Sequence, residues 1–258
     1  MGIVDLFNLK DNVAIVTGAS SGLGVAFALA MAEAGADVVC ADKEENGLIE
    51  TVNKIKKIDR KSIGIVTDVS KEKDVKNMVK QSLKEFGRID ILFNNAGIVE
   101  TPVPAHELSL EEWDKVIAVD LTGVFLCAKE VLKVMIEQKS GKLINISSIW
   151  GQVGSSVFPV PAYAAAKGGV INFTRELAIE YAEYGINVNC IAPGSFKTEI
   201  GGGDYNDPQF LDTILNLIPI KKVGVPNDLK GVAIFLASKA SNFITGHILT
   251  IDGGWLAR

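Results

Sequence analysis

Histidine and cysteine are scarce in this sequence, and their scarcity narrows the chemistry that it can support. Among 258 residues there are two histidines, His106 and His247, and three cysteines, with no Cys-x-x-Cys pair. We therefore predict no metal site, and a Ser-His-Asp triad is nearly excluded. The cysteines lie far apart within apolar segments, so we expect small buried side chains rather than a disulfide framework at Cys40, Cys127 and Cys190.

Long apolar segments and an excess of positive charge are also missing. No apolar run approaches the ~18 residues of a membrane helix, and the N-terminus has no signal-peptide pattern. Lys and Arg number 26 against 31 Asp and Glu, a formal net charge of −5. Because basic residues are not clustered with aromatics, we expect no nucleic-acid partner. We expect a soluble cytoplasmic protein with no membrane partner.

The sequence does contain a regular alternation of short apolar runs and helical patterns. Strands are expected at 13–17, 37–41, 62–66, 89–93, 142–147, 186–191 and 247–251. Helices are expected at 24–34, 44–58, 71–86, 110–137, 161–184 and 228–238. Strands that are apolar on both faces indicate a parallel sheet covered by helices on both sides. The pattern predicts an α/β, doubly wound (Rossmann-type) fold in a single domain, 1–258.

One stretch, 193–226, has no such alternation and contains Gly201-Gly202-Gly203. Irregular stretches of this length are usually binding loops or lids, or else disordered. We predict a substrate lid around 194–226. Near its end, Lys221 and Lys222 either attract an anionic group of a substrate or form an ordinary solvated face.

A glycine-rich turn, Gly18-x-x-x-Gly22-x-Gly24, follows the first expected strand and opens the first helix. It matches neither G-x-G-x-x-G nor a P-loop, because no Lys-Ser/Thr follows. Glycines here allow the backbone to approach a pyrophosphate, whose charge is favoured at a helix N-terminus. The alternative is a glycine-rich turn that binds nothing.

Polar residues follow the next three strands, at what would be the ligand edge of an open α/β sheet. Asp42 ends the second strand, where a carboxylate accepts hydrogen bonds from both ribose hydroxyls of an adenosine and repels a 2′-phosphate. This favours NAD over NADP, although Lys43 is a counter-signal, and Asp42 is alternatively a helix cap. Asp68-Val69 and Asn94-Asn95-Ala96-Gly97 follow the third and fourth strands.

Tyr163 and Lys167 are four positions apart and share one face of an expected helix. An ammonium beside a phenol favours the phenolate and lowers the phenol pKa from about 10, which makes the pair a usable acid and base. Ser147 and Ser148 end the fifth strand, where a hydroxyl can hold a carbonyl or alcohol oxygen. Taken alone, Tyr-x-x-x-Lys is usually just a helix face.

Taken together and in order, these motifs resemble the short-chain dehydrogenase/reductase family over nearly the whole chain from about Leu9. The resemblance rests on Thr17-Gly18-x-x-x-Gly22-x-Gly24, Asn94-Asn95-Ala96-Gly97, Asn145-Ile146-Ser147-Ser148, Tyr163-x-x-x-Lys167, Pro193-Gly194 and Asp252-Gly253-Gly254. It implies a seven-stranded Rossmann fold and an oxidoreductase of alcohols and carbonyls. It also implies a homotetramer in which the helix bearing Tyr163 packs at a subunit interface.

The resemblance also implies roles for individual residues. Tyr163 corresponds to the proton donor and acceptor, Lys167 to the residue that lowers its pKa and binds the nicotinamide ribose, and Ser148 to the group that polarises the substrate oxygen. Ile191 matches a cofactor-contacting position. The residues expected to contact NAD are Gly18, Ser20, Ser21, Gly22, Leu23, Gly24, Asp42, Lys43, Asp68, Val69, Asn95, Ala96, Gly97, Tyr163, Lys167, Pro193, Gly194, Phe196 and Thr198.

The motifs thus predict an NAD(H)-dependent enzyme that interconverts a secondary alcohol and a ketone. Two alternatives remain open at this point, a nucleotide-sugar epimerase or dehydratase and a protein that senses NAD without catalysis. No sequence motif identifies the alcohol or ketone.

Two departures from the family pattern are visible. The family usually has Asn where this chain has Asp120, which falls within an apolar helical stripe formed by Trp113, Ile117, Val124, Cys127, Val131 and Met135. A buried charge is costly unless it is paired, so we predict either a protonated Asp120 that donates in a proton relay or a water in its place. Alternatively, Asp120 caps a helix break near Gly123.

The second departure is the spacing from Ser148 to Tyr163, which at 15 positions is longer than is usual in the family. The extra residues fall beside the expected substrate pocket. Trp150 and Phe158 either line that pocket or are plain packing.

Overall fold

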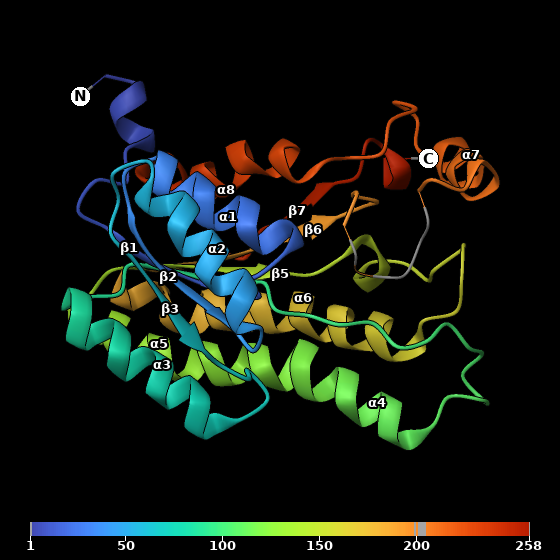
Figure 1. The fold of residues 1–258 in the computed structure, drawn as a ribbon, viewed down its shortest axis with the longest axis horizontal. Coiled ribbons are helices and arrows are strands. Elements are labelled where there is room, and N and C mark those ends of the chain that lie inside the picture. Colours follow the sequence, from blue (N-terminus) through green and yellow to red (C-terminus); the bar gives the residue numbers. More distant parts are fainter. Residues whose placement is uncertain (1, 199, 201–204, 258) are drawn as a thin grey trace.

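All seven strands belong to one parallel sheet in the order β3-β2-β1-β4-β5-β6-β7 (Figure 1). This computed structural model describes residues 2–198, 200 and 205–257. The strands are β1 Val13–Thr17, β2 Asp37–Asp42, β3 Ser62–Val66, β4 Ile91–Asn94, β5 Gly141–Ile146, β6 Ile186–Pro193 and β7 Ile248–Ile251. Successive strands run outward from β1 to β3, and the chain then crosses back to β4 on the other side of β1. The point where the order reverses is where open α/β sheets bind ligands.

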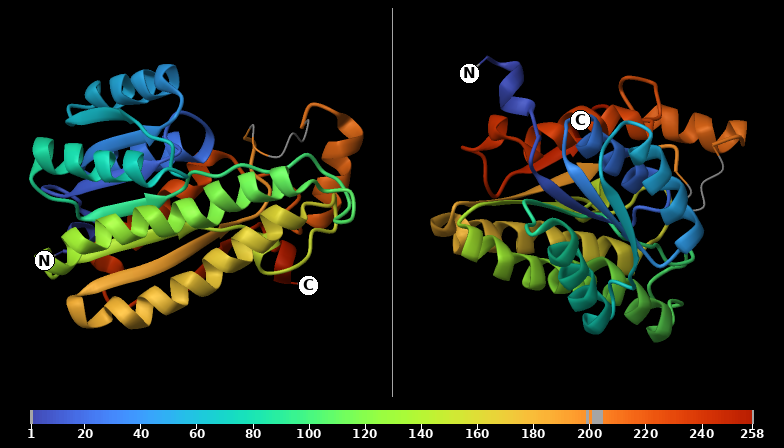
Figure 2. Two further views of the ribbon diagram at one scale, coloured as in Figure 1. Left: turned by 90° about the horizontal axis from the view of Figure 1, so that it is seen from below. Right: turned by 60° about the vertical axis from the view of Figure 1, so that its left-hand side comes forward.

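Two layers of helices cover the sheet (Figures 1 and 2). The helices are α1 Gly22–Glu33, α2 Glu45–Lys56, α3 Glu72–Phe86, α4 Leu110–Ile117, α5 Gly123–Gln138, α6 Pro161–Tyr181, α7 Pro208–Leu217 and α8 Lys230–Ala237. One layer consists of α1, α2 and α8, and the other of α3, α4, α5 and α6. The predicted doubly wound α/β fold is confirmed.

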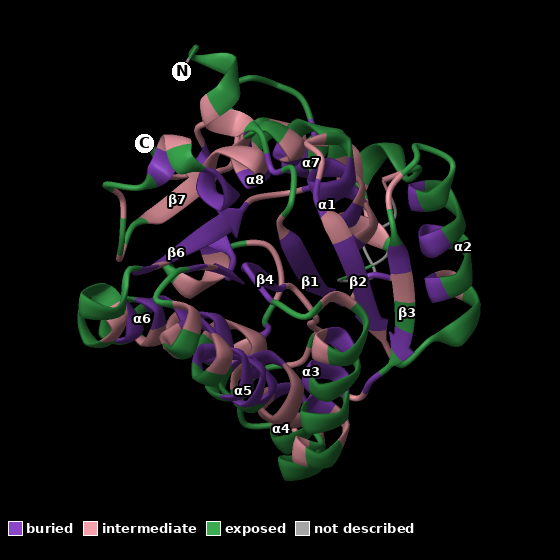
Figure 3. Cartoon of the chain, turned by 90° about the vertical axis from the view of Figure 1, so that its left-hand side faces the viewer, coloured by how far each residue is buried: buried purple, intermediate pink, exposed green. Residues whose placement is uncertain are grey.

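The position of β1 in the centre of the sheet, between the two helix layers, explains why its sequence is apolar throughout. Side chains alternate between the two faces of a strand. Ala14 and Val16 belong to the core under the α1 layer, whereas Val13 and Ile15 belong to the core under the α5 layer. All five residues of β1 are buried, and Figure 3 shows the buried strands between helices whose outer faces are exposed.

The structure differs from the sequence prediction within 110–137, where one long helix was expected. A π-helical turn, Ala118–Thr122, separates α4 from α5 and contains Asp120. A π turn inserts an extra residue into the helical repeat, and such turns occur frequently at functional sites. Apolar residues continue at helical spacing on both sides of the turn, so the sequence pattern conceals it.

A second difference lies in 193–226, which was expected to be irregular but contains α7. Asp207 accepts a hydrogen bond from the backbone N–H of Gln209 at 3.0 Å, and Pro208 occupies the first helical position. Both are standard helix-start signals. The glycines 201–203 lie outside the described residues. The helix lies at the end of the molecule where α4 and α6 begin (Figure 1).

The α7 region has an apolar cluster of its own, which we call the α7 cluster. Its buried members are Ile149, Ile214, Ile218, Val223 and Trp255, and Trp150, Tyr205 and Phe210 pack against them. The rings of Trp150 and Trp255 meet edge to face with their centroids 5.3 Å apart. This cluster is separate from the two cores that flank the sheet.

The cysteines and the lysine pair are placed as ordinary structural residues. All three cysteines are buried, as predicted, and burial raises the pKa of each thiol to about 12. Lys222 forms an ion pair with Asp228 at 3.1 Å, and Lys221 donates to the carbonyl of Leu215. Neither lines the main cavity, which favours the solvated-face interpretation. In the described part of the chain, every helix is too short or too polar to cross a membrane.

Candidate active site

A cavity of about 610 Å³ lies at the carboxyl edge of the sheet, lined by residues that follow strands β1 to β6. Of the residues predicted to be catalytic or to contact the cofactor, all line it except Asp120 and Ile191. Ile191 is buried in the core. Parallel strands bring their carboxyl ends to one edge, so residues scattered from 18 to 198 meet there.

The glycine-rich turn is tied to the loop after β4. Asn95 donates from its side-chain amide to the carbonyl oxygens of Thr17 at 2.9 Å and Gly18 at 3.3 Å. In return, the Thr17 hydroxyl oxygen accepts from the backbone N–H groups of Asn95 at 3.0 Å and Ala96 at 3.1 Å. These four hydrogen bonds fix the two loops against each other.

Glycine is required in this turn because the backbone segments approach closely. Gly18 has φ of 68°, and a Cβ at Gly18 would lie 2.8 Å from the Cα of Ala96. A Cβ at Gly24 would meet the carbonyl oxygen of Gly18. The α1 N-terminus faces this cradle, and Ser21 at its N-cap makes no side-chain capping hydrogen bond. Free N–H groups beside an open turn suit a pyrophosphate, so a dinucleotide fits here.

Asp42 holds the turn from the other side. One carboxylate oxygen accepts from both the backbone N–H of Ser20 at 3.0 Å and its hydroxyl at 2.7 Å. The other accepts from the N–H of Glu44 at 3.1 Å, just before α2. A carboxylate has about four acceptor sites, so Asp42 retains capacity for a ribose hydroxyl. Helix α2 has no side-chain cap, so Asp42 does not cap it, and the remaining acceptor capacity of Asp42 leaves room for cofactor binding.

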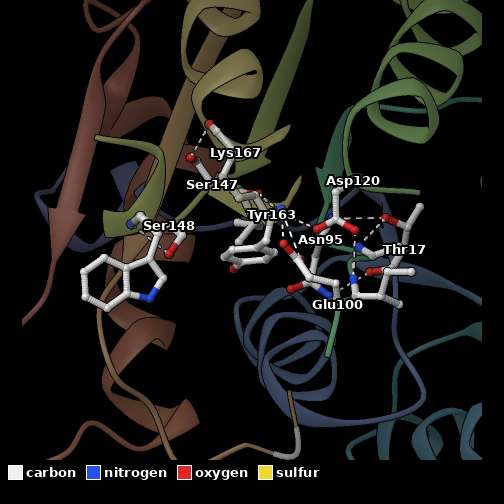
Figure 4. A network of polar contacts seen from close by, with 12 residues as sticks. Thr17, Asn95, Glu100, Asp120, Ser147, Ser148, Tyr163 and Lys167 are labelled. Atoms are coloured by element: carbon white, nitrogen blue, oxygen red, sulfur yellow. Dashed lines mark hydrogen bonds and ion pairs between the residues drawn. The ribbon is translucent and has the colours of Figure 1, made fainter. Parts of the chain in front are cut away.

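Tyr163 and Lys167 lie on one face of α6, as predicted (Figure 4). The Lys167 ammonium lies 5.5 Å from the centroid of the Tyr163 ring. It donates to the carbonyl of Ile146 at 3.1 Å and forms an ion pair with Asp120, also at 3.1 Å. The Ser147 hydroxyl donates to the backbone carbonyl of Lys167 at 2.8 Å and thereby joins α6 to the end of β5.

The charges around Tyr163 act in opposite directions on its pKa. Burial raises the pKa of the Tyr163 phenol, Lys167 and the Ser148 hydroxyl lower it, and Asp120 raises it further. The net pKa of Tyr163 lies above its ordinary value. Lys167 does lower this pKa, as predicted from the sequence, but burial and Asp120 outweigh it. Burial disfavours the Lys167 ammonium, yet Asp120 and Tyr163 hold the pKa of Lys167 above its ordinary value.

Ser148 lies beside this pair, and a side-chain hydrogen bond links its hydroxyl to the Tyr163 phenol. It caps a short 3-10 turn, Ile149–Gly151, and its Oγ accepts from the N–H of Trp150 at 3.2 Å. A hydroxyl that accepts in this way still has its own proton for a ligand oxygen. Trp150 and Phe158 also line the cavity, so the pocket alternative holds for both.

Comparisons with known proteins agree with this arrangement. A family model described as "Enoyl-(Acyl carrier protein) reductase" matches residues 18–256. The 2-dehydro-3-deoxy-D-gluconate 5-dehydrogenase of Formosa agariphila is 41% identical over 98% of this chain and 96% of its own. A short-chain type dehydrogenase/reductase from Mycobacterium marinum superposes with a TM-score of 0.94 at 34% identity, covering 100% of both chains.

The chain belongs to the short-chain dehydrogenase/reductase family. A gluconate 5-dehydrogenase from Burkholderia cenocepacia, solved in complex with NADP and tartrate, also superposes with a TM-score of 0.94 at 34% identity, covering 100% of both chains. Oxidoreduction of an alcohol or carbonyl by a nicotinamide cofactor is therefore the chemistry of its relatives.

Asp120, the first of the two expected departures from the family pattern, is completely buried. Its Oδ1 accepts from the backbone N–H of Ile98 at 2.8 Å, and its Oδ2 lies 3.1 Å from the Lys167 ammonium without a well-directed hydrogen bond. The pKa of Asp120 is raised above its ordinary value, because burial and the nearby Glu100 outweigh the lowering by Lys167 and the Ile98 N–H.

Both carboxyl oxygens of Asp120 thus face donors, a geometry that favours an acceptor and ion-pair partner over the donor predicted from the sequence. The carboxyl does not cap the helix break either, although the break exists. Gly97 packs closely against this carboxyl group, because a Cβ at Gly97 would lie 2.8 Å from Oδ2 of Asp120.

Glu100 is the site residue that sequence reasoning missed. Its side chain is buried and accepts hydrogen bonds from the backbone N–H groups of Ala162 at 2.7 Å and Tyr163 at 3.1 Å. The available signal is modest. Glu100 is the single acidic residue between Asn95 and His106, in a loop already expected at the ligand edge.

Proposed function

We propose that this chain is an NAD(H)-dependent oxidoreductase that interconverts a secondary alcohol and a ketone, with Tyr163 as the general acid and base. The observation that carries the proposal is the convergence of Ser148, Tyr163 and Lys167 on one cavity beside a glycine cradle that fits a dinucleotide. The named relatives support the coarser function, because they are dehydrogenases.

Each residue has a defined task in this mechanism. In the oxidation direction, the Tyr163 phenolate removes the proton of the substrate hydroxyl, and in reduction the phenol returns it. The Ser148 hydroxyl donates to the same oxygen and stabilises the negative charge that develops there. The Lys167 ammonium favours the phenolate through its charge. A nicotinamide cofactor bound along the glycine cradle would accept or supply the hydride.

The preference for NAD rests on Asp42, and a single substitution tests it. Asp42→Ala removes a charge-assisted hydrogen bond worth roughly 1.5–3 kcal/mol. We expect the KM for NAD to rise by about tenfold to a hundredfold, because ~1.4 kcal/mol corresponds to a factor of ten. The KM for NADP should fall, since the repulsion of a 2′-phosphate is relieved. Steady-state kinetics with both cofactors measures the change.

Ser20 provides the matched control, because Asp42 also holds the glycine-rich turn through it. Ser20→Ala removes the 2.7 Å hydroxyl contact with Asp42 but keeps the carboxylate. It should therefore affect both cofactors equally. A wild-type enzyme that already prefers NADP, the cofactor bound in the Burkholderia cenocepacia relative, would show that this role of Asp42 is wrong.

The substrate is found by assay. A panel of secondary alcohols and ketones, followed by NADH absorbance at 340 nm, tests the reaction class. The sugar acids named in the relatives come first. Turnover of any member supports an enzyme. Tight NADH binding with no turnover across the panel would favour the alternative of a non-catalytic NAD sensor.

We also propose a cytoplasmic homotetramer with α5 and α6 at its subunit interface. Two large apolar side chains are exposed on these helices, Phe125 at 45% and Ile179 at 81%. Phe125 also packs edge to face against Phe173 of α6, with ring centroids 6.3 Å apart, so apolar surface continues from α5 onto α6. Sedimentation velocity tests the assembly, and a monomeric protein at micromolar concentration would contradict it.

A further inference from the structure

Glu100 is a buried carboxylate that the proposed chemistry does not yet use. It lies in the loop after β4 with only 3% of its surface exposed. Its two oxygens face the first turn of α6, the helix that carries Tyr163 (Figure 4). A buried carboxylate is costly unless its oxygens are satisfied, so this placement needs a compensating interaction.

The first turn of α6 supplies that interaction, because it has no cap of its own. Pro161 at the first position has no N–H, and Val160 at the N-cap has no polar side chain. The N–H of Ala164 bonds the carbonyl of Val160 at 2.9 Å. The N–H groups of Ala162 and Tyr163 remain, and Glu100 accepts from both. A carboxylate at this end is also favoured by the helix dipole.

We propose that Glu100 is a positioning residue for the proton transfer by Tyr163. By holding the N–H of Tyr163 itself and that of the preceding residue, it fixes where the phenol enters the cavity relative to Ser148 and Lys167. Glu100 also connects the loop that contains residues 95–97 with the start of α6. This inference rests on the proposed role of Tyr163 as acid and base.

The charge of Glu100 provides a readout that a purely structural role would not change. Among the described residues, four groups act electrostatically on the Tyr163 phenol: Lys167 on α6, Asp120 on the π turn, Ser148 after β5, and Glu100 through its charge. The Glu100 carboxylate acts with burial and Asp120 to raise the pKa of Tyr163. Its removal should therefore lower this pKa, so that the phenolate forms at lower pH. In alcohol oxidation the rising limb of the pH–rate profile should shift to lower pH.

Glu100→Gln is the main test. The amide keeps one oxygen for the Ala162 N–H, loses the charge, and presents an NH₂ group to the Tyr163 N–H. We expect kcat to fall by about 10- to 100-fold, because small displacements of a reacting group cause losses of this size. The rising limb should also shift to lower pH. The affinity for NADH, measured by fluorescence titration, should stay near that of the wild type.

Asp90→Asn is the matched control. Asp90 is also a buried carboxylate, 5% exposed, and accepts a backbone N–H, that of Val13, at 2.8 Å. It precedes β4 and so lies at the opposite edge of the sheet. This variant should lower Tm without changing kcat or the pH profile.

Glu100→Asp separates the effect of the charge from the effect of side-chain length. It also provides a test if Glu100→Gln does not fold. It keeps the carboxylate but shortens the side chain, so kcat should fall while the rising limb stays at the wild-type pH. Wild-type kcat and pH profile in Glu100→Gln, or wild-type kcat in Glu100→Asp, would overturn the inference if Tyr163→Phe is inactive. An active Tyr163→Phe would instead contradict the proposed function.

Discussion

Tyr163→Phe is expected to lower kcat by at least the ~10²–10⁴-fold typical of losing a general acid or base. The substitution removes only the hydroxyl, so the ring keeps its place beside the Lys167 ammonium. NADH affinity should therefore be largely retained. Steady-state kinetics on a substrate identified from the panel, together with NADH fluorescence titration, separates the two effects.

A second tyrosine on the same helix serves as the control for Tyr163→Phe. Tyr181 lies at the other end of α6, where its ring is 6.1 Å from that of Tyr184. Tyr181→Phe should leave kcat unchanged. If Tyr163→Phe kept a near-normal kcat, proton transfer would have to pass through another group, and the proposed mechanism would fail.

Asp120→Leu is the variant with the largest expected effect on stability. It removes the buried partner of Lys167 and leaves an uncompensated charge, which typically costs about 3–5 kcal/mol. The unpaired ammonium would then deprotonate more easily, and its support for the phenolate would be lost. We expect a strong fall in Tm, measured by thermal unfolding, and loss of activity.

Asp120→Asn distinguishes the acceptor role seen in the structure from the donor role expected from sequence. The amide keeps an oxygen for the Ile98 N–H but removes a charge that raises the pKa of Tyr163. Carbonyl reduction needs the protonated phenol, so its falling alkaline limb should shift to lower pH in Asp120→Asn. A donor role predicts the opposite, an alkaline limb that flattens because the amide cannot ionise. Identical profiles for the wild type and this variant would leave Asp120 with neither role.

Most of the residues that line the cavity could be predicted from the sequence, because the topology of a parallel sheet determines where they lie. Once the apolar runs indicated parallel strands, any polar residue just after a strand was expected at the same edge, and Asp42, Asp68 and Asn95 were found there. The prediction was independent of side-chain detail. It therefore succeeded over distances of more than a hundred residues in sequence.

The features it missed depend on contacts without a local signature. Glu100 caps a helix that begins 61 positions later, so no motif around either end records the interaction. The π turn at Asp120 lies within an apolar stripe whose period continues on both sides. For α7 the signals, Asp207 and Pro208, were present but were outweighed by the glycine-rich stretch before them.

The separation of the α7 cluster from the two cores of the sheet has a consequence for how this protein can diversify. Mutations at positions far apart with no shared partners contribute nearly independently to stability. Substitutions at residues such as Ile214 and Phe210 can therefore change the shape of the cavity wall beside Trp150. The stability contributed by the two cores of the sheet should change little. Under the proposed function, a library confined to the α7 cluster is therefore a direct way to vary the cavity wall at Trp150 and Tyr205 and to search for new substrate ranges.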